Sequence, residues 1–81
     1  MKLPRDLSGK ELAKALAVLG YTPTRQTGSH LRLRTVESGG EHHVTVPQNK
    51  ALPLGTLAAI LSEVAEHFGI TRDELVSRIF R

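Results

Sequence analysis

The sequence of 81 residues contains no cysteine and no tryptophan, and its aromatic residues are Tyr21, Phe68 and Phe80. The lack of cysteine excludes disulfide bonds, thiolate zinc sites and cysteine catalysis, and it is compatible with a reducing compartment. Because aromatic rings are so few, aliphatic side chains must fill the hydrophobic core. A second core would need roughly 50 more residues, so we expect residues 1–81 to form a single domain.

Long hydrophobic runs are also missing. No segment approaches the ~18 apolar residues of a membrane-spanning helix. The segment Met1–Arg5 leads into polar sequence rather than into the hydrophobic stretch of a signal peptide. We therefore expect a soluble protein of the cytoplasm that has no membrane partner.

The formal net charge of +3 is distributed unevenly. Residues 1–40 carry seven basic and three acidic side chains, a net charge of +4, whereas residues 41–81 carry four basic and five acidic ones. An excess of positive charge favours a polyanionic partner. Nucleic acid is favoured over a membrane surface, because no basic amphipathic helix with large apolar anchors is present. On charge alone, a basic surface that only confers solubility explains the sequence equally well.

Two capping boxes and one apolar stripe predict helices. Ser8 and Glu11 have the S-x-x-E spacing that satisfies free amides at a helix start, and Gly20 is placed to close a helix over about 9–19. Thr71 and Glu74 repeat this pattern before a short last helix. Between them, a stripe with helical spacing predicts a second helix that a glycine ends, formed by Leu57, Ile60, Leu61, Val64, Phe68 and Gly69.

Residues 21–47 predict three short antiparallel strands. The first, over 21–27, contains Pro23, which indicates an edge strand or a strand that starts after it. A tight turn at Gly28-Ser29 leads into a second strand, and Glu37–Gly40 turns the chain into a third that ends at Pro47. Apolar and polar residues alternate in the second and third strands: Leu31, Leu33, Val44 and Val46 on one face, His30, Arg32, Arg34, His43 and Thr45 on the other.

The predicted order is therefore α-β-β-β-α-α, an α+β fold with a three-stranded antiparallel sheet. Helices on one face would bury the leucine and valine stripes, and the face with His30, Arg32 and Arg34 would be left to solvent.

Four histidines are the main candidates for chemistry. His67, late in the predicted second helix, is explained as a residue that favours the helix dipole. His42 and His43 are adjacent on a strand, so they point to opposite faces and cannot bind one metal together. No ligand spacing typical of zinc is present, so we expect neither a metal nor a cofactor.

His30 has a different setting. It follows the predicted turn, shares a strand face with Arg32 and Arg34, and has Arg25 on the neighbouring strand. An imidazole can accept or give a proton near neutral pH, and guanidinium groups can bind and polarise a phosphodiester. RNA carries its own nucleophile, the 2′-hydroxyl, so such a site could cleave it without metal. From the pattern alone, a polar histidine without catalytic function remains the more common explanation.

Several segments in a fixed order resemble one known family. They are residues 8–12, 16–21, 25–30, 42–47 and 55–57, and the stretch ending in Gly28-Ser29-His30 is the most diagnostic. The sequence resembles the HicA (YcfA-like) family of mRNA interferase toxins. The resemblance implies a fold similar to the double-stranded-RNA-binding domain, ribonuclease activity through His30, translation arrest, and neutralisation by a HicB-type antitoxin.

The sequence departs from the family pattern at two places. Many members have a histidine at the position of Asn49, and basic residues at the positions of Ala58 and Ala59. Lys50 is then the nearby cation, and we expect RNA contacts to shift toward the first two strands. A mechanism with a second histidine at residue 49 is not available here.

The leading hypothesis is a type II toxin that acts as a metal-independent endoribonuclease on mRNA, with His30 as the general base. The candidate RNA-binding residues are Lys10, Arg25, Gly28, Ser29, Arg32, Arg34 and Lys50. An RNA-binding module without catalysis is the first alternative. A protein-interaction partner whose basic face meets an acidic antitoxin is the second.

Overall fold

The computed structural model describes residues 3–80, so Met1, Lys2 and Arg81 lie outside the described residues. In chain order the elements are α1 (Gly9–Leu16), the 3-10 helix η1 (Ala17–Leu19), β1 (Thr22–Thr27), β2 (His30–Thr35), β3 (His42–Pro47), α2 (Leu54–Phe68) and α3 (Arg72–Ile79). This order confirms the predicted α+β fold.

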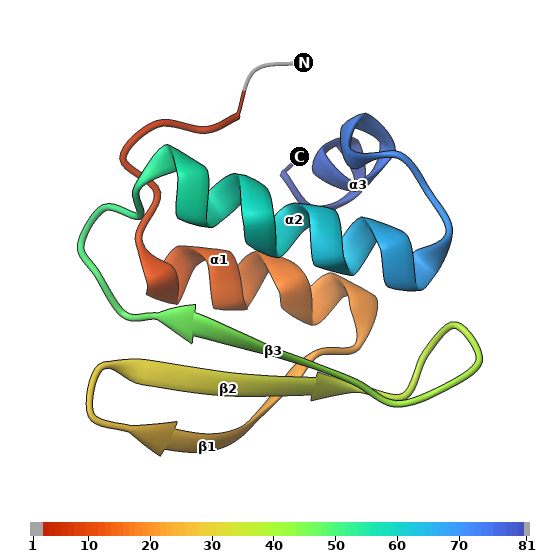
Figure 1. Ribbon diagram of the computed structural model, residues 1–81, viewed down its shortest axis with the longest axis horizontal. Coiled ribbons are helices and arrows are strands. Elements are labelled where there is room, and N and C mark those ends of the chain that lie inside the picture. Colours follow the sequence, from red (N-terminus) through yellow and green to blue (C-terminus); the bar gives the residue numbers. More distant parts are fainter. Residues whose placement is uncertain (1–2, 81) are drawn as a thin grey trace.

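The strands form an antiparallel sheet in the order β1-β2-β3. Figure 1 shows the helices on one face of this sheet, with α1 and α2 next to it and α3 beyond them. The core between these layers is aliphatic apart from one tyrosine; its most deeply buried members include Leu12, Leu16, Tyr21, Leu33, Val46, Leu57, Leu61, Val64 and Leu75. The other sheet face is left to solvent, as the alternating pattern predicts.

Local signals start and end the helices where the sequence indicates. The Ser8 hydroxyl accepts a hydrogen bond from the Glu11 amide, and the Glu11 carboxylate accepts one from the Ser8 amide. The helix predicted over 9–19 changes character after Leu16, because its last turn is a 3-10 helix in which the Gly20 amide donates to the Ala17 carbonyl at 3.0 Å. This tighter turn satisfies a terminal carbonyl that an α-helix would leave free.

Strand β1 is an edge strand, as Pro23 indicates, and it contains a β-bulge. Pro23 pairs with Leu33, but the next pair is Arg25 with Arg32. Thr24 and Arg25 therefore both lie opposite Arg32. In a regular ladder Arg25 would pair with Leu31 and face the core, because a shift of one residue moves a side chain to the other sheet face. The bulge brings Arg25 to the solvent face.

Candidate active site

His30 is the first residue of β2 and pairs with Thr27 across the hairpin. The turn before it contains Gly28, whose positive φ of 59° is a conformation that favours glycine. The carbonyl of Ser29 accepts a hydrogen bond of 2.6 Å from the Gln48 amide, which ties the turn to the segment after β3. The imidazole is thus exposed on a backbone that is held from two sides.

A shallow cleft of about 230 Å³ surrounds His30 on the solvent face of the sheet. Its lining residues are Arg25, Thr27, His30, Arg32 and Thr45. The structure therefore brings together the proposed base and two of the three arginines that the sequence analysis places beside it, Arg25 and Arg32. Sequence analysis missed Thr27 and Thr45, although the alternation in the third predicted strand places Thr45 on the polar face.

The two arginines of the cleft lie directly opposite each other on β1 and β2. Like charges in such a cross-strand pair repel, so the pair destabilises the sheet in the absence of a counter-ion. A phosphate between the guanidinium groups would relieve this repulsion and accept hydrogen bonds from both. Arg32 is oriented further by Thr45, whose hydroxyl accepts a hydrogen bond of 3.3 Å from Nη1 of Arg32.

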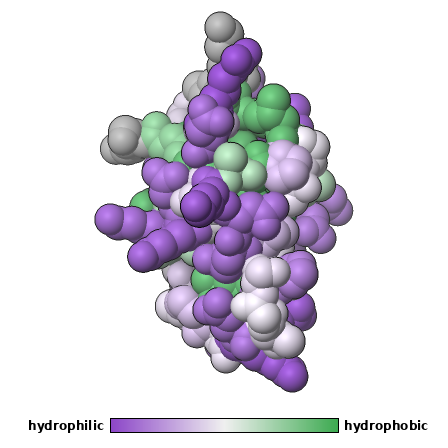
Figure 2. Space-filling view, turned by 90° about the vertical axis from the view of Figure 1, so that its left-hand side faces the viewer, coloured by the Kyte–Doolittle hydropathy of each residue, from purple (hydrophilic) through white to green (hydrophobic). Residues whose placement is uncertain are grey.

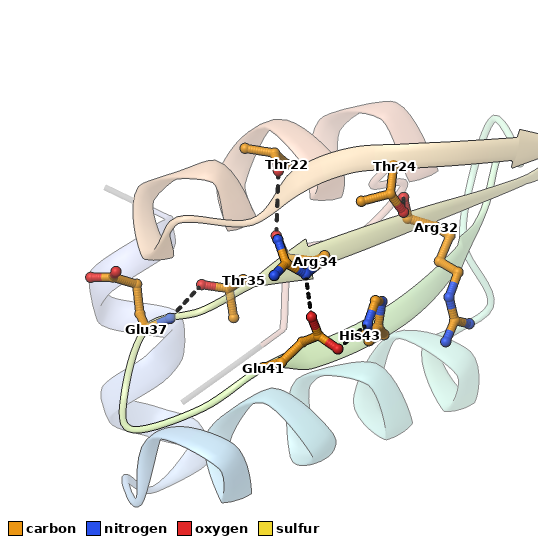
Figure 3. A network of polar contacts seen from close by, with 8 residues as sticks. All are labelled: Thr22, Thr24, Arg32, Arg34, Thr35, Glu37, Glu41 and His43. Atoms are coloured by element: carbon orange, nitrogen blue, oxygen red, sulfur yellow. Dashed lines mark hydrogen bonds and ion pairs between the residues drawn. The ribbon is translucent and has the colours of Figure 1, made fainter.

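Arg34 lies on the same face but does not line the cleft. Its Nε donates to Oε2 of Glu41 at 2.6 Å, and Oε1 of Glu41 accepts a hydrogen bond of 3.1 Å from Nε2 of His43. Figure 3 shows Glu41 between these two side chains, with Arg32 farther along β2. The hydrogen bond from Arg34 and then that from His43 lower the pKa of Glu41, so the carboxylate stays ionised and compensates the charge of Arg34.

Lys10 and Lys50 are exposed near the same end of the molecule. The Gly9 amide donates to the Asn49 carbonyl at 3.0 Å, which joins the start of α1 to the segment after β3. That segment is also bonded to the turn before His30, so both lysines lie at the end of the sheet where β2 begins. Figure 2 faces this side of the molecule, whose surface is mostly hydrophilic, with hydrophobic residues exposed in its upper part and in smaller spots elsewhere.

The structure shows where the three residues that depart from the family pattern lie, which are Asn49, Ala58 and Ala59. Asn49 is exposed in the segment after β3 and contributes its carbonyl to the contact with α1. Ala58 and Ala59 lie in the second turn of α2, where they supply no charge. Lys50 is therefore the cation available between β3 and α2.

A second group of polar rings lies on the helix side of the sheet. The Tyr21 hydroxyl is 2.7 Å from Nδ1 of His42, and the His42 ring stacks on that of His67 with 4.5 Å between centroids. Nε2 of His67 donates to the Glu37 carbonyl at 2.9 Å. His67 is in the last turn of α2 as expected, but these contacts were not predicted. The available signal was that His42 has the same strand parity as Val44 and Val46.

Burial shifts the pKa values of this second group. Burial, with a smaller effect of Glu63, raises the pKa of Tyr21 to about 12. Burial lowers the pKa of His42, and the neighbouring His67 lowers it further. A hollow of about 470 Å³ at this place is lined by His42, Glu63, Glu66 and His67. Within residues 3–80, however, no group of three or more histidines and carboxylates is arranged to hold a metal ion.

A family model described as HicA toxin of bacterial toxin-antitoxin matches residues 9–66, from the start of α1 almost to the end of α2. The chain belongs to the HicA toxin family. It is therefore a toxin of a toxin–antitoxin system, and an antitoxin is its partner. No curated protein and no solved structure matches the chain significantly.

The match places every residue of the cleft within the HicA toxin region, from Arg25 to Thr45. Helix α3 lies outside the matched residues and adds Leu75 and Val76 to the core. In the part of this HicA toxin that the structure describes, no helix is long and apolar enough to cross a membrane.

Proposed function

We propose that this HicA toxin is a metal-independent endoribonuclease that cleaves mRNA and so arrests translation. The observation that carries the proposal is the cleft in which His30 lies with Arg25 and Arg32 on the solvent face of the sheet. A proton acceptor can activate the 2′-hydroxyl of RNA, and cations beside it can bind the phosphate and stabilise the charge that develops during cleavage.

In the proposed reaction His30 removes the proton of a 2′-hydroxyl. The 2′-oxygen attacks the adjacent phosphorus, the bond from phosphorus to the 5′-oxygen breaks, and the leaving oxygen takes a proton from water. The products are a 2′,3′-cyclic phosphate and a 5′-hydroxyl end. Arg25 and Arg32 bind the phosphate oxygens, and their positive charge stabilises the additional negative charge of the transition state.

The remaining candidate residues extend the site without entering the cleft. Lys10 and Lys50 lengthen the path of positive charge along the RNA backbone, while Gly28 and Ser29 shape the turn that presents His30. Tyr21 is buried and cannot stack on a base. Affinity should therefore come from phosphate contacts, weaken with added salt, and depend little on base sequence.

The proposal also includes the domain organisation, the cellular compartment and the antitoxin of this toxin. Residues 1–81 are proposed to act as one HicA domain in the cytoplasm, where mRNA is translated. The antitoxin is proposed to be of the HicB type, as the resemblance of the sequence implies.

RNA binding without cleavage is the second candidate function. It is favoured by one observation: among the described residues, 3–80, the cleft is lined by His30 and by no second histidine that could protonate the leaving oxygen. Arg25 and Arg32 would serve binding equally well.

Cleavage of a labelled RNA in the presence of EDTA tests the proposal. We expect the parent protein to produce cyclic phosphate ends, and His30→Ala to reduce the rate by about 10²–10⁴, because a general base contributes that much. His67→Ala is the matched control, since it removes a histidine on the helix side of the sheet. Circular dichroism should show the same fold for His30→Ala as for the parent protein, because His30 is exposed.

Two results would contradict this assignment. Undiminished cleavage by His30→Ala would remove His30 from the mechanism. RNA that the parent protein binds but leaves intact would favour the binding module.

A further inference from the structure

Glu41 occupies a position that an external anion could take. Its two carboxylate oxygens accept hydrogen bonds from two different side chains, Arg34 at 2.6 Å and His43 at 3.1 Å. Arg34 and His43 are cross-strand partners on β2 and β3, so the sheet holds both donors side by side. A phosphate group offers the same pair of acceptor oxygens to such donors.

This arrangement lies on the same sheet face as the His30 cleft. His30, Arg32 and Arg34 follow one another at alternate positions of β2, which is a spacing of about 6.6 Å for each step along a strand. Arg34 is thus roughly 13 Å from His30 along β2, beyond the edge of the cleft. An RNA strand that is bound at His30 and follows β2 would reach it only if it is longer than the cleft.

Glu41 is able to leave this position. It precedes β3, and its side chain is 53% exposed, so it is not enclosed by the core. Its ionised carboxylate is held by exposed hydrogen bonds and an exposed ion pair, which contribute little in water. While it stays in place, it both occupies the donors and repels phosphate.

We propose that Arg34 and His43 form a second phosphate subsite for the RNA substrate, and that Glu41 closes this subsite until a sufficiently long strand displaces it. This inference rests on the proposed function of the His30 cleft. Glu41 thereby limits the length of RNA that contributes to affinity: short strands use the cleft alone, and longer strands must compete with an internal carboxylate.

The experiment compares two single-stranded oligodeoxynucleotides, a dinucleotide and a dodecanucleotide, which lack the 2′-hydroxyl and are not cleaved. The dinucleotide has a single internucleotide phosphate, so it cannot occupy the cleft and the second subsite at once. Their dissociation constants are measured over a series of salt concentrations for the parent protein and Glu41→Gln. We expect Glu41→Gln to bind the dodecanucleotide more tightly, with a salt slope steeper by about 0.7 for the one additional phosphate contact. Binding of the dinucleotide should not change.

Two further variants separate this effect from net charge. Glu66→Gln removes the same charge from the helix side of the molecule and should not change the dependence on length. The double variant Glu41→Gln/Arg34→Gln should lose the gain. As a second measurement, the dodecanucleotide but not the dinucleotide should shift the NMR signals of the His43 ring.

The outcomes distinguish this inference from the proposed function. An equal gain in affinity for both lengths, or a gain in affinity with Glu66→Gln, would overturn the subsite. The subsite would also be wrong if the parent cleaves RNA normally and Glu41→Gln binds the dodecanucleotide no more tightly than the parent does. A parent that binds neither oligonucleotide would contradict the proposed function as well. If Glu41→Gln changes binding of the antitoxin and not of the dodecanucleotide, the network belongs to a protein interface and the RNA subsite is wrong.

Discussion

His42 and His43 are neighbours in sequence but have opposite environments. Strand alternation turns His42 toward Tyr21 and His67 on the helix side, and it turns His43 toward Glu41 on the solvent side. The sequence predicts this separation, and the structure confirms it. The partners of His42 could not be predicted, because His67 is 25 positions away along the chain and meets it only through tertiary packing.

The environment of His42 makes stability depend on pH. Burial lowers the pKa of His42 in the folded protein. When the pH falls below about 6.5, the unfolded chain therefore binds more protons at this histidine than the folded protein does. The contribution of His42 to the free energy of unfolding is therefore fully present above this pH, and it is lost as the pH falls from there toward the lowered pKa. Glu11 and Glu41 also have lowered pKa values, but their contributions are lost only below about pH 4.5, the ordinary value for glutamate.

We expect urea denaturation to show a lower stability at about pH 5.5 than at about pH 7.5, on either side of the ordinary pKa of histidine. His42→Phe should reduce this difference, because it removes the group that titrates and keeps a ring against His67. His30→Ala, which changes an exposed histidine, should retain the full difference. An equal loss in the His42→Phe protein would show that another group causes it.

At the scale of elements, the predictions that succeeded depend on local sequence. The capping boxes at Ser8 and Thr71 and the left-handed caps at Gly20 and Gly69 each involve residues within one helical turn. The β-bulge was not predicted, because Pro23 and the residues after it show no local sign of which residue will be added to the ladder. It decides that Arg25 reaches the cleft.

The position of Thr45 in the cleft illustrates the same limit. Its hydrogen bond with Arg32 depends on the register between β2 and β3, which the turn over 37–40 sets. The alternation of polar and apolar residues predicts the face on which Thr45 lies, but a register shifted by two residues would keep the same faces and give Thr45 another partner. Of the residues that line the cleft, the sequence analysis named His30, Arg25 and Arg32, and it did not name Thr27 and Thr45.

The packing of α1 on the end of β3 provides a prediction for a single element. A Cβ atom at Gly9 would lie 2.0 Å from the carbonyl oxygen of Pro47, which is backbone and cannot move aside easily. We expect Gly9→Ala to destabilise the fold by about 1–3 kcal/mol, as overpacking does. Urea denaturation measures this effect.

Gly55→Ala is the matched control for this substitution. Gly55 lies in the first turn of α2, and no atom is within 4 Å of the position of its Cβ. Alanine should be neutral or slightly stabilising there, because it favours helix more than glycine does. A Gly9→Ala protein as stable as Gly55→Ala would mean that α1 and β3 can separate without cost.

In the molecule as a whole, the two faces of the sheet have different roles: one packs the core and the other presents the candidate site. One face is covered by the helices and contains the aliphatic core, while the other carries His30 and the arginines without packing demands. This division explains how a chain of 81 residues keeps paired cations on its surface. It also leaves the cleft open, and within residues 3–80 no helix or strand covers His30.

An exposed cleft must be silenced from outside, and this leads to a prediction about the antitoxin. We expect the antitoxin to cover His30 and to place acidic side chains against Arg25 and Arg32, because complementary charge speeds association and competes with RNA phosphate. Arg32→Glu should therefore weaken the complex strongly, mainly by slowing association. Arg72→Glu and Arg78→Glu, on α3, should change it little.

The competing mechanism is inhibition from a distance through α3. It would need an element with two alternative arrangements that couples α3 to the cleft. Leu75, Val76 and Ile79 are instead buried in the same core as the sheet, so α3 has no second place to pack. Association rates of the three charge-reversal variants, measured by surface plasmon resonance, decide between the two: a complex that tolerates Arg32→Glu and is lost with Arg72→Glu would place the antitoxin on α3 and rule out direct coverage of His30.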